Sequence, residues 1–265
     1  MTRLTIQDIQ TMKSRGERIA MVTAYDATFA RLVDEAGADV ILVGDSLGMV
    51  VQGHDSTLPV TMDHMVYHTQ SVMRGANRCL VIGDLPFMSY QVTVEDALRN
   101  GGRLLSEGAC QAVKLEGGVR SAPAIRALVE AGIPVCGHIG LTPQSFNALG
   151  GFRVQGRNGT AEKILEDAKA VEEAGAFCIV LEAIPAPLAK TITEALTIPT
   201  VGIGAGVHCD GQVLVSYDYL GLNDGFKPRF LKRYASLGDA VREATKGYVN
   251  DVREGTFPGD EHSFS

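Results

Sequence analysis

The chain has 265 residues, 45% hydrophobic and 21% charged, a composition typical of a globular domain with a large apolar core. Its formal net charge is −7, and because an acidic surface repels phosphate backbones, we expect no nucleic acid partner. No apolar run is long enough to span a bilayer, so we expect no membrane partner. No signal core follows Met1, and the five cysteines form no C-x-x-C pair, so we expect a cytoplasmic protein.

The predicted elements repeat one unit along the chain. Thr5 to Met12 predicts a helix that covers one end of the domain. After it, amphipathic stretches alternate with eight short apolar runs, which are Ile19 to Ala24, Val40 to Val43, Cys79 to Ile82, Ala112 to Leu115, Ile133 to Cys136, Phe177 to Leu181, Thr200 to Ile203 and Val213 to Val215. Apolar runs that are continuous instead of alternating indicate strands buried on both faces of a parallel sheet.

Several amphipathic stretches end in a helix-stop signal. These signals are Glu35-Ala36-Gly37-Ala38, Glu107-Gly108-Ala109, Glu130-Ala131-Gly132 and Glu173-Ala174-Gly175-Ala176. Glycine is favoured just past a helix because it adopts positive φ without steric cost. Eight βα units in a chain of this length favour the α/β class and a closed (β/α)8 TIM barrel over an open doubly wound sheet.

Two further segments flank or interrupt the barrel. Ala235 to Arg253 predicts a C-terminal helical extension, and the polar tail 255–265 is expected to be flexible. Gly150 to Arg157, a glycine-rich excursion after the fifth run, is predicted to be a lid or a loop for a second substrate. Together with the capping helix, these segments predict a single catalytic domain over residues 1–265.

Polar residues end five consecutive apolar runs. They are Asp45 and Ser46, Asp84, Lys114 and Glu116, His138, and Glu182. In a barrel all of these positions face the C-terminal rim and converge on one pocket. Three carboxylates in one pocket repel each other unless a cation lies between them. Oxygen ligands suit magnesium, and the histidine and cysteine spacing of a zinc site is absent.

The roles of the remaining residues stay open from the pattern alone. Asp45 and Asp84 are the better candidates for direct metal ligands, whereas Glu116 binds the metal directly or through a water. Lys114 precedes Glu116 by two and so points to the same side; it binds an anionic substrate group or only neutralises carboxylates. Glu182 is the candidate general base, with a fourth metal ligand or a rim salt bridge as the alternatives. His138 contacts the substrate, orients another side chain or is purely structural.

A glycine-rich segment, Gly202 to Gly206, follows the seventh run. In many barrels a loop at this place holds a phosphate group. Glycines also let the chain turn and approach its neighbours closely, so the segment does not by itself predict a ligand.

Long motifs in the same order resemble one family, that of ketopantoate hydroxymethyltransferase (3-methyl-2-oxobutanoate hydroxymethyltransferase), from about residue 5 to about residue 255. They are VTAYDATFA from Val22, LVGDSLGMVVQGHDSTLPVT from Leu42, DLPFMSYQ from Asp84, VKLEGG from Val113, GHIGLTPQS from Gly137, VQGR from Val154, VGIGAG from Val201 and DGQVLVSYDYLG from Asp210. Several long motifs in a fixed order are far more specific than any single glycine pattern.

The resemblance implies roles for the residues that end the runs. It implies one Mg²⁺ per subunit at Asp45, Asp84 and Glu116. It implies contacts with a 2-oxo acid from Asp45, Ser46, Asp84 and Lys114, a base at Glu182 and a supporting role for His138.

The resemblance also implies a reaction and an assembly. The chain would transfer a hydroxymethyl group from the co-substrate 5,10-methylenetetrahydrofolate to 3-methyl-2-oxobutanoate through a metal-stabilised enolate, giving 2-dehydropantoate for pantothenate and coenzyme A synthesis. A homo-oligomer, a decamer by analogy with the family, is implied as well. The alternatives are a metal-dependent barrel lyase acting on a related 2-oxo acid, a phosphate-binding barrel and a non-catalytic barrel that assembles or binds.

Overall fold

The computed structural model describes residues 2–157, 159–223, 225 and 227–264, and the chain divides into two compact units, Met1–Val215 and Ser216–Ser265. In the first unit eight parallel strands form a closed barrel in sequence order, with β8 paired to β1. They are β1 (Ile19–Thr23), β2 (Val40–Val43), β3 (Leu80–Asp84), β4 (Ala112–Glu116), β5 (Val135–Gly140), β6 (Cys178–Glu182), β7 (Thr200–Ile203) and β8 (Gly211–Leu214). The predicted barrel is confirmed, although β8 begins two residues earlier than expected.

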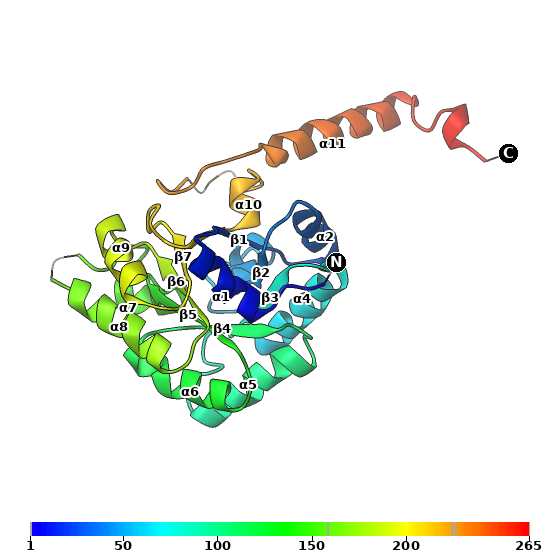
Figure 1. Cartoon of the computed structure of the whole chain (residues 1–265). Helices are drawn as coiled ribbons and strands as arrows, with labels where there is room; N and C mark the ends of the chain where they lie inside the picture. Colours follow the sequence, from blue (N-terminus) through cyan, green and yellow to red (C-terminus); the bar gives the residue numbers. More distant parts are fainter. Residues whose placement is uncertain (1, 158, 224, 226, 265) are drawn as a thin grey trace. The chain divides into compact units, whose positions relative to one another are not determined.

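Helices surround the strands on the outside of this unit (Figure 1). They are α2 (Ala27–Glu35), α4 (Met62–Gly75), α5 (Val94–Ser106), α6 (Ala122–Glu130), α8 (Ala161–Glu173) and α9 (Ala186–Ala195). The short helices α3 (Leu47–Val50) and α7 (Phe146–Leu149) lie in the connections that follow β2 and β5, and 3₁₀ turns lie at Val119–Ser121 and Pro143–Ser145. The connection from β7 to β8 has no helix between them.

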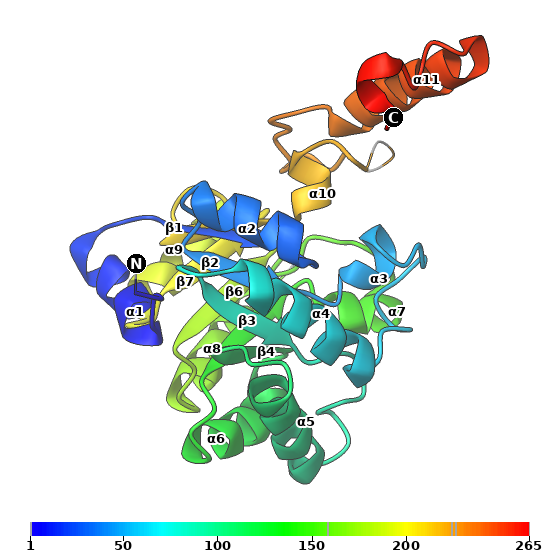
Figure 2. The ribbon, with the colours of Figure 1, turned by 90° about the vertical axis from the view of Figure 1, so that its right-hand side faces the viewer.

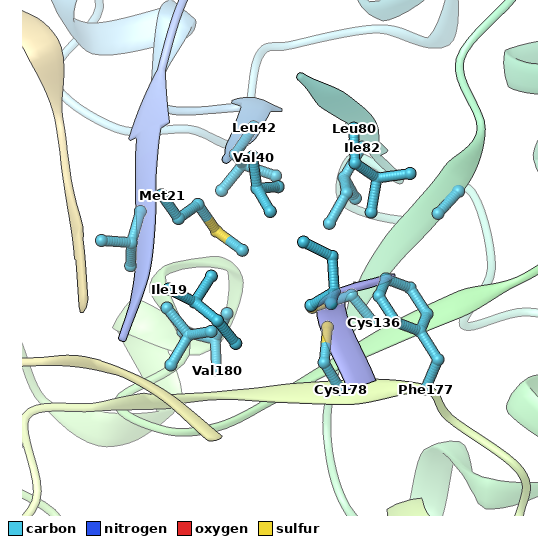
Figure 3. Close-up of a cluster of buried hydrophobic side chains, with 14 residues drawn as sticks. Ile19, Met21, Val40, Leu42, Leu80, Ile82, Cys136, Phe177, Cys178 and Val180 are labelled. Atoms are coloured by element: carbon cyan, nitrogen blue, oxygen red, sulfur yellow. The ribbon is translucent and has the colours of Figure 1, made fainter. Parts of the chain in front are cut away.

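The N-terminal helix α1 (Ile6–Arg15) packs against the barrel interior, as predicted. Thr5 begins it with a capping box to Asp8, and Ile9 is buried among the side chains that fill the barrel. Figure 3 shows side chains from several strands, including Met21, Ile82 and Val180, pointing into this common interior. The barrel is therefore a filled core, and chemistry is confined to its rim.

One helix-stop signal works differently from the prediction. Gly37, Gly132 and Gly175 have positive φ, as expected of residues just past a helix. After α5, however, the residue with positive φ is Ala109, at 63°. Glycine is required at position 108 for a different reason, because the chain passes close to the end of α5. A Cβ there would lie 2.5 Å from the carbonyl oxygen of Leu104.

Asp34 on α2 ties this helix to the start of β3. Its buried carboxylate accepts backbone hydrogen bonds from Asn77, Arg78 and Cys79. Burial opposes ionisation, but the hydrogen bonds from these residues outweigh it and hold the pKa of Asp34 below its usual value. The ionised Asp34 carboxylate therefore stabilises the fold above the pKa of an unfolded aspartate, about 4. This stabilisation is lost as the pH falls through the pKa of Asp34 in the folded state.

We expect Asp34→Asn to lower the free energy of unfolding by about 1–3 kcal/mol at pH 7, because the amide replaces a charged acceptor. Urea titrations should show the difference from the wild type narrowing below pH about 4. The exposed neighbour Glu35 provides the control, since Glu35→Gln should change stability by less than about 0.5 kcal/mol. A constant difference across this pH range would contradict the role of the Asp34 charge.

The second unit contains α10 (Ser216–Tyr219), α11 (Leu237–Glu254) and a 3₁₀ turn at Asp260–His262. The predicted C-terminal helix is thus confirmed, starting two residues later than expected. In the segment predicted to be a flexible tail, the Phe257 ring lies 5.6 Å from that of Tyr248 and 5.1 Å from that of His262. Across the described residues, no helix has both the length and the apolar character that crossing a bilayer requires.

Candidate active site

The register of the barrel places the predicted site residues side by side. Asp84 on β3 is the direct partner of Lys114 on β4, and Glu116 on β4 is the partner of His138 on β5. Glu182 at the end of β6 pairs with Gly140 of β5. Because all of these strands are parallel, their ends meet at one rim of the barrel. The structure therefore brings these predicted residues into one buried cluster.

Lys114 is held by carboxylates. Its Nζ lies 2.8 and 2.7 Å from the two carboxylate oxygens of Asp84 and 4.0 Å from Oε1 of Glu116. Burial disfavours the ammonium, but the nearby carboxylates of Asp84, Glu116 and Asp45 outweigh burial and raise the pKa of Lys114. This contact supports a neutralising role; binding of an anionic substrate group by the same ammonium stays a prediction.

Asp45 lies against Asp84 in the cluster. Its backbone N–H is 3.4 Å from Oδ2 of Asp84, and its own Oδ2 accepts a hydrogen bond of 2.9 Å from Nε2 of Gln144. Burial, followed by the negative charges of Asp84 and Glu116, raises the pKa of Asp45 well above its usual value. The pKa of Asp84 is raised too, because burial outweighs the Lys114 ammonium. Lys114 alone therefore does not compensate the negative charge at this point.

His138 stands between two carboxylates. Nδ1 lies 3.3 Å from Oε1 of Glu116 and Nε2 lies 3.1 Å from Oε2 of Glu182, although neither contact has the alignment of a hydrogen bond. Burial and the charge of Lys114 oppose protonation of the ring, but Glu116 and Glu182 outweigh them and raise the pKa of His138 to about 9. The imidazole links the base candidate to the carboxylate cluster.

Gly140 sets the spacing between the ends of β5 and β6. Its φ is +93°, and a Cβ at this position would lie 2.2 Å from the backbone oxygen of Glu182. Only a residue without a side chain allows the two strands to approach this closely. Gly140 thereby fixes where Glu182 stands relative to His138.

Ser46 begins α3 beside the cluster. Its Oγ lies 2.9 Å from the hydroxyl of Tyr25, which is itself buried at the end of β1. The contact fixes the Ser46 side chain next to Asp45. Its predicted role in binding the 2-oxo acid stays a prediction.

Two buried residues of the site are absent from the sequence-based set. Gln144 donates to Asp45 and to the backbone oxygen of Leu85, and its backbone N–H is 3.1 Å from Oε2 of Glu116. Tyr90 donates to Oε1 of Gln144 at 2.8 Å and accepts from the backbone N–H of Glu116 at 3.0 Å. Both lie in loops, where strand-end reasoning gives no signal, although both fall inside motifs that carry the family resemblance.

Two predicted loops have clear structural contacts. In the predicted lid, the backbone N–H of Gln155 donates to the oxygen of Ala183 at 2.9 Å, next to Glu182. In the glycine-rich segment after β7, a Cβ on Gly206 would lie 2.5 Å from Cβ of Ala186, and the Gly206 oxygen accepts from Gln212. Close packing accounts for Gly206. Closure of the lid and phosphate binding by the second loop stay predictions.

The donor chemistry of the cluster fits a hard divalent cation. Four carboxylates converge here against two groups that can be cationic, and these six are Asp45, Asp84, Glu116, Glu182, Lys114 and His138. When all are ionised, two negative charges remain. Among the described residues no three Asp, Glu, His or Cys side chains already form a ligand set. Asp45 and Asp84 lie adjacent, whereas Glu116 is engaged by His138 and by the backbone N–H of Gln144.

Comparisons with known proteins cover nearly the whole chain. The family model described as ketopantoate hydroxymethyltransferase matches residues 3–260. The 3-methyl-2-oxobutanoate hydroxymethyltransferase of Syntrophotalea carbinolica is 58% identical over 99% of both chains. That of Chloroflexus aurantiacus is 60% identical over 98% of this chain and 92% of its own.

Among solved structures, phosphonopyruvate hydrolase in complex with oxalate and Mg²⁺ has a TM-score of 0.65 at 13% identity, covering 99% of this chain and 93% of the other. The 2,3-dimethylmalate lyase, a member of the PEP mutase/isocitrate lyase superfamily, has a TM-score of 0.62 at 17% identity, covering 98% and 91%. At these identities the structural likeness concerns the barrel fold.

Proposed function

The chain belongs to the ketopantoate hydroxymethyltransferase family, and we propose that it transfers a hydroxymethyl group from 5,10-methylenetetrahydrofolate to 3-methyl-2-oxobutanoate, giving 2-dehydropantoate for pantothenate synthesis. The observation that carries the proposal is the buried cluster at the rim, where Asp45, Asp84 and Lys114 lie beside the linked pair His138 and Glu182. It combines a site for an oxo acid with a candidate base.

Asp45 and Asp84 would hold one Mg²⁺, and Glu116 would bind it through a water. Direct binding by Asp45 and Asp84 is supported by their adjacent, buried positions. Binding of Glu116 through a water is supported by its existing contacts with His138 and with the backbone N–H of Gln144. When bound, the cation supplies Lewis-acid polarisation of the substrate ketone and offsets negative charge.

The residues of the chain bind the 2-oxo acid and move its proton. Ser46 and Lys114 contact the oxo acid, and the ammonium of Lys114 stabilises the negative charge that develops as the C3 proton leaves. Glu182 takes this proton, and His138, 3.1 Å away, positions the carboxylate. C3 then forms a bond to the one-carbon unit, and both bonds from this unit to the folate nitrogens break. Water supplies the hydroxyl oxygen, and the C3 proton and one proton of the water end on the two nitrogens as N–H groups.

An assay with two readouts tests the proposal. With Mg²⁺, the protein should exchange the C3 proton of 3-methyl-2-oxobutanoate in deuterated water and consume this acid only when methylenetetrahydrofolate is added. A chelator should slow exchange at least about 100-fold, since the cation contributes several kcal/mol to charge stabilisation, and Mg²⁺ should restore it. Undiminished exchange by metal-free protein would refute the metal site. Consumption without folate would instead indicate a lyase.

Assembly and location belong to the same proposal. An apolar stripe on α11, formed by Leu237, Val241, Tyr248 and Val252, leaves Val241 57% and Tyr248 58% exposed, which supports burial in a homo-oligomer, for which we propose a decamer. Light scattering on the full chain tests this, since a mass of one chain would contradict it. All five cysteines are free and buried, which supports a reducing cytoplasmic location.

A further inference from the structure

A cavity of about 320 Å³ lies beside the active site. The loops that follow β3, β4 and β5 form it, together with the first residues of α5 and α6, which lie next to each other in the barrel wall (Figure 2). These are the connections at the C-terminal rim, the face on which barrel enzymes bind substrates. The volume falls within the range of about 300–1,000 Å³ typical of small-molecule sites.

The cavity shares a wall with the catalytic cluster. Gln144 lines the cavity, and its Nε2 is 2.9 Å from Oδ2 of Asp45. Tyr90 lines it as well and contacts both Gln144 and the backbone of Glu116. A molecule in the cavity is therefore separated from the cluster by one layer of side chains, close enough for a long ligand to reach both.

The lining has a definite chemical character. Phe87, Val92 and Pro123 provide apolar surface, and Arg120 is the only charged residue among the described residues that line the cavity. Nη2 of Arg120 donates to Oγ of Ser145 at 2.9 Å, and this side chain has no carboxylate partner in the described part of the chain within ion-pair distance. The cavity thus combines an apolar slot with one uncompensated cation.

We propose that this cavity binds the aminobenzoylglutamate half of the folate co-substrate, an inference that rests on the proposed function. The benzoyl ring packs against Phe87 and Pro123, and the glutamate carboxylates pair with Arg120. The pterin half offers adjacent N–H donors that a carboxylate would accept, and no carboxylate lines the cavity. The pterin and the one-carbon unit therefore lie toward the catalytic cluster, past Gln144.

A matched pair of ligands isolates the contact with the glutamate. Calorimetric titration of the Mg²⁺-loaded full chain would use 5-formyltetrahydrofolate and 5-formyltetrahydropteroate, which lacks the glutamate. Arg120→Gln should weaken binding of the folate about 10-fold and leave binding of the pteroate unchanged, since loss of a charge-assisted hydrogen bond affects only the ligand that makes it. Arg126→Gln, an exposed charge on α6 outside the cavity, should change neither.

The possible outcomes distinguish failure of the cavity assignment from failure of the proposed function. Equal effects of Arg120→Gln on both ligands, or no effect on either, would overturn the cavity assignment while leaving the folate donor in place. Absence of folate binding to the wild type would overturn both proposals. Val92→Glu adds a carboxylate to the exposed wall of the cavity and should also weaken binding of the folate but not of the pteroate. Exchange of the C3 proton should persist in all of these variants, showing that the catalytic cluster is intact.

Discussion

Glu182→Gln is expected to slow exchange of the C3 proton of 3-methyl-2-oxobutanoate by about 10² to 10⁴-fold, the usual contribution of a positioned base. The amide keeps the length and shape of the side chain but cannot accept the proton. The oxo acid should still bind, because the residues proposed to hold it, Asp45, Ser46 and Lys114, are unchanged. The measurement is loss of the C3 proton signal in deuterated water, followed by NMR, together with the dissociation constant of the oxo acid.

The exposed residue Glu162 on α8 provides the matched control. Glu162→Gln removes the same charge from an exposed side chain outside the cluster and should leave exchange at the rate of the wild type. Exchange at this rate in Glu182→Gln would exclude Glu182 as the base. If Glu182→Gln lost both binding of the oxo acid and exchange, Glu182 would be assigned to substrate or metal binding instead. A metal ligand is one of the alternatives that the sequence analysis gives for this residue.

Lys114→Met should lower the free energy of unfolding by about 3–5 kcal/mol in metal-free buffer at pH 8, the usual cost of removing one partner from a buried ion pair. The substitution leaves the carboxylates of Asp84, Glu116 and Asp45 buried without their ammonium. It should also abolish detectable exchange, because the same ammonium stabilises charge during proton removal. Chemical denaturation measures the first effect.

The pH dependence identifies the cause of this loss. Without Lys114 the pKa values of the buried carboxylates rise further, so the folded state binds protons more tightly than the unfolded state and stability recovers as the pH falls from 8 to 6. The double variant Lys114→Met/Asp84→Asn should be more stable than Lys114→Met alone, since it removes one unpaired charge. Lys163→Met, an exposed change on α8, should have little effect. A deficit that does not depend on pH would point to lost packing.

The sequence predicts the barrel well because a parallel sheet leaves a strong local signal. Strands buried on both faces appear as continuous apolar runs, and each helix stop directly precedes the next run. Ala109 shows where the local signal fails. A Gly-Ala pair marks the end of α5, but Ala109 takes the positive φ, whereas Gly108 lies close to the Leu104 carbonyl and to Thr69 of α4. The absence of a helix between β7 and β8 is also invisible in the apolar pattern.

The residues of the site also differ in how well the sequence predicts them. Residues at strand ends, such as Asp84 and Lys114, are predictable because the register of a closed barrel forces them together. Gln144, Tyr90 and Arg120 lie in loops, whose path depends on contacts far apart in the sequence. Gln144 contacts Asp45, 99 positions away, and no periodicity encodes that distance. Loop residues of this kind require the fold before their neighbours can be identified.

The missing side chain at Gly140 has a consequence for anyone who redesigns this enzyme. A methyl group there would meet the backbone of Glu182 at 2.2 Å, so even alanine would push apart the two strands that carry His138 and Glu182. A mutant library aimed at new oxo acids should therefore keep position 140 constant, so that the two proton-transfer groups keep their spacing.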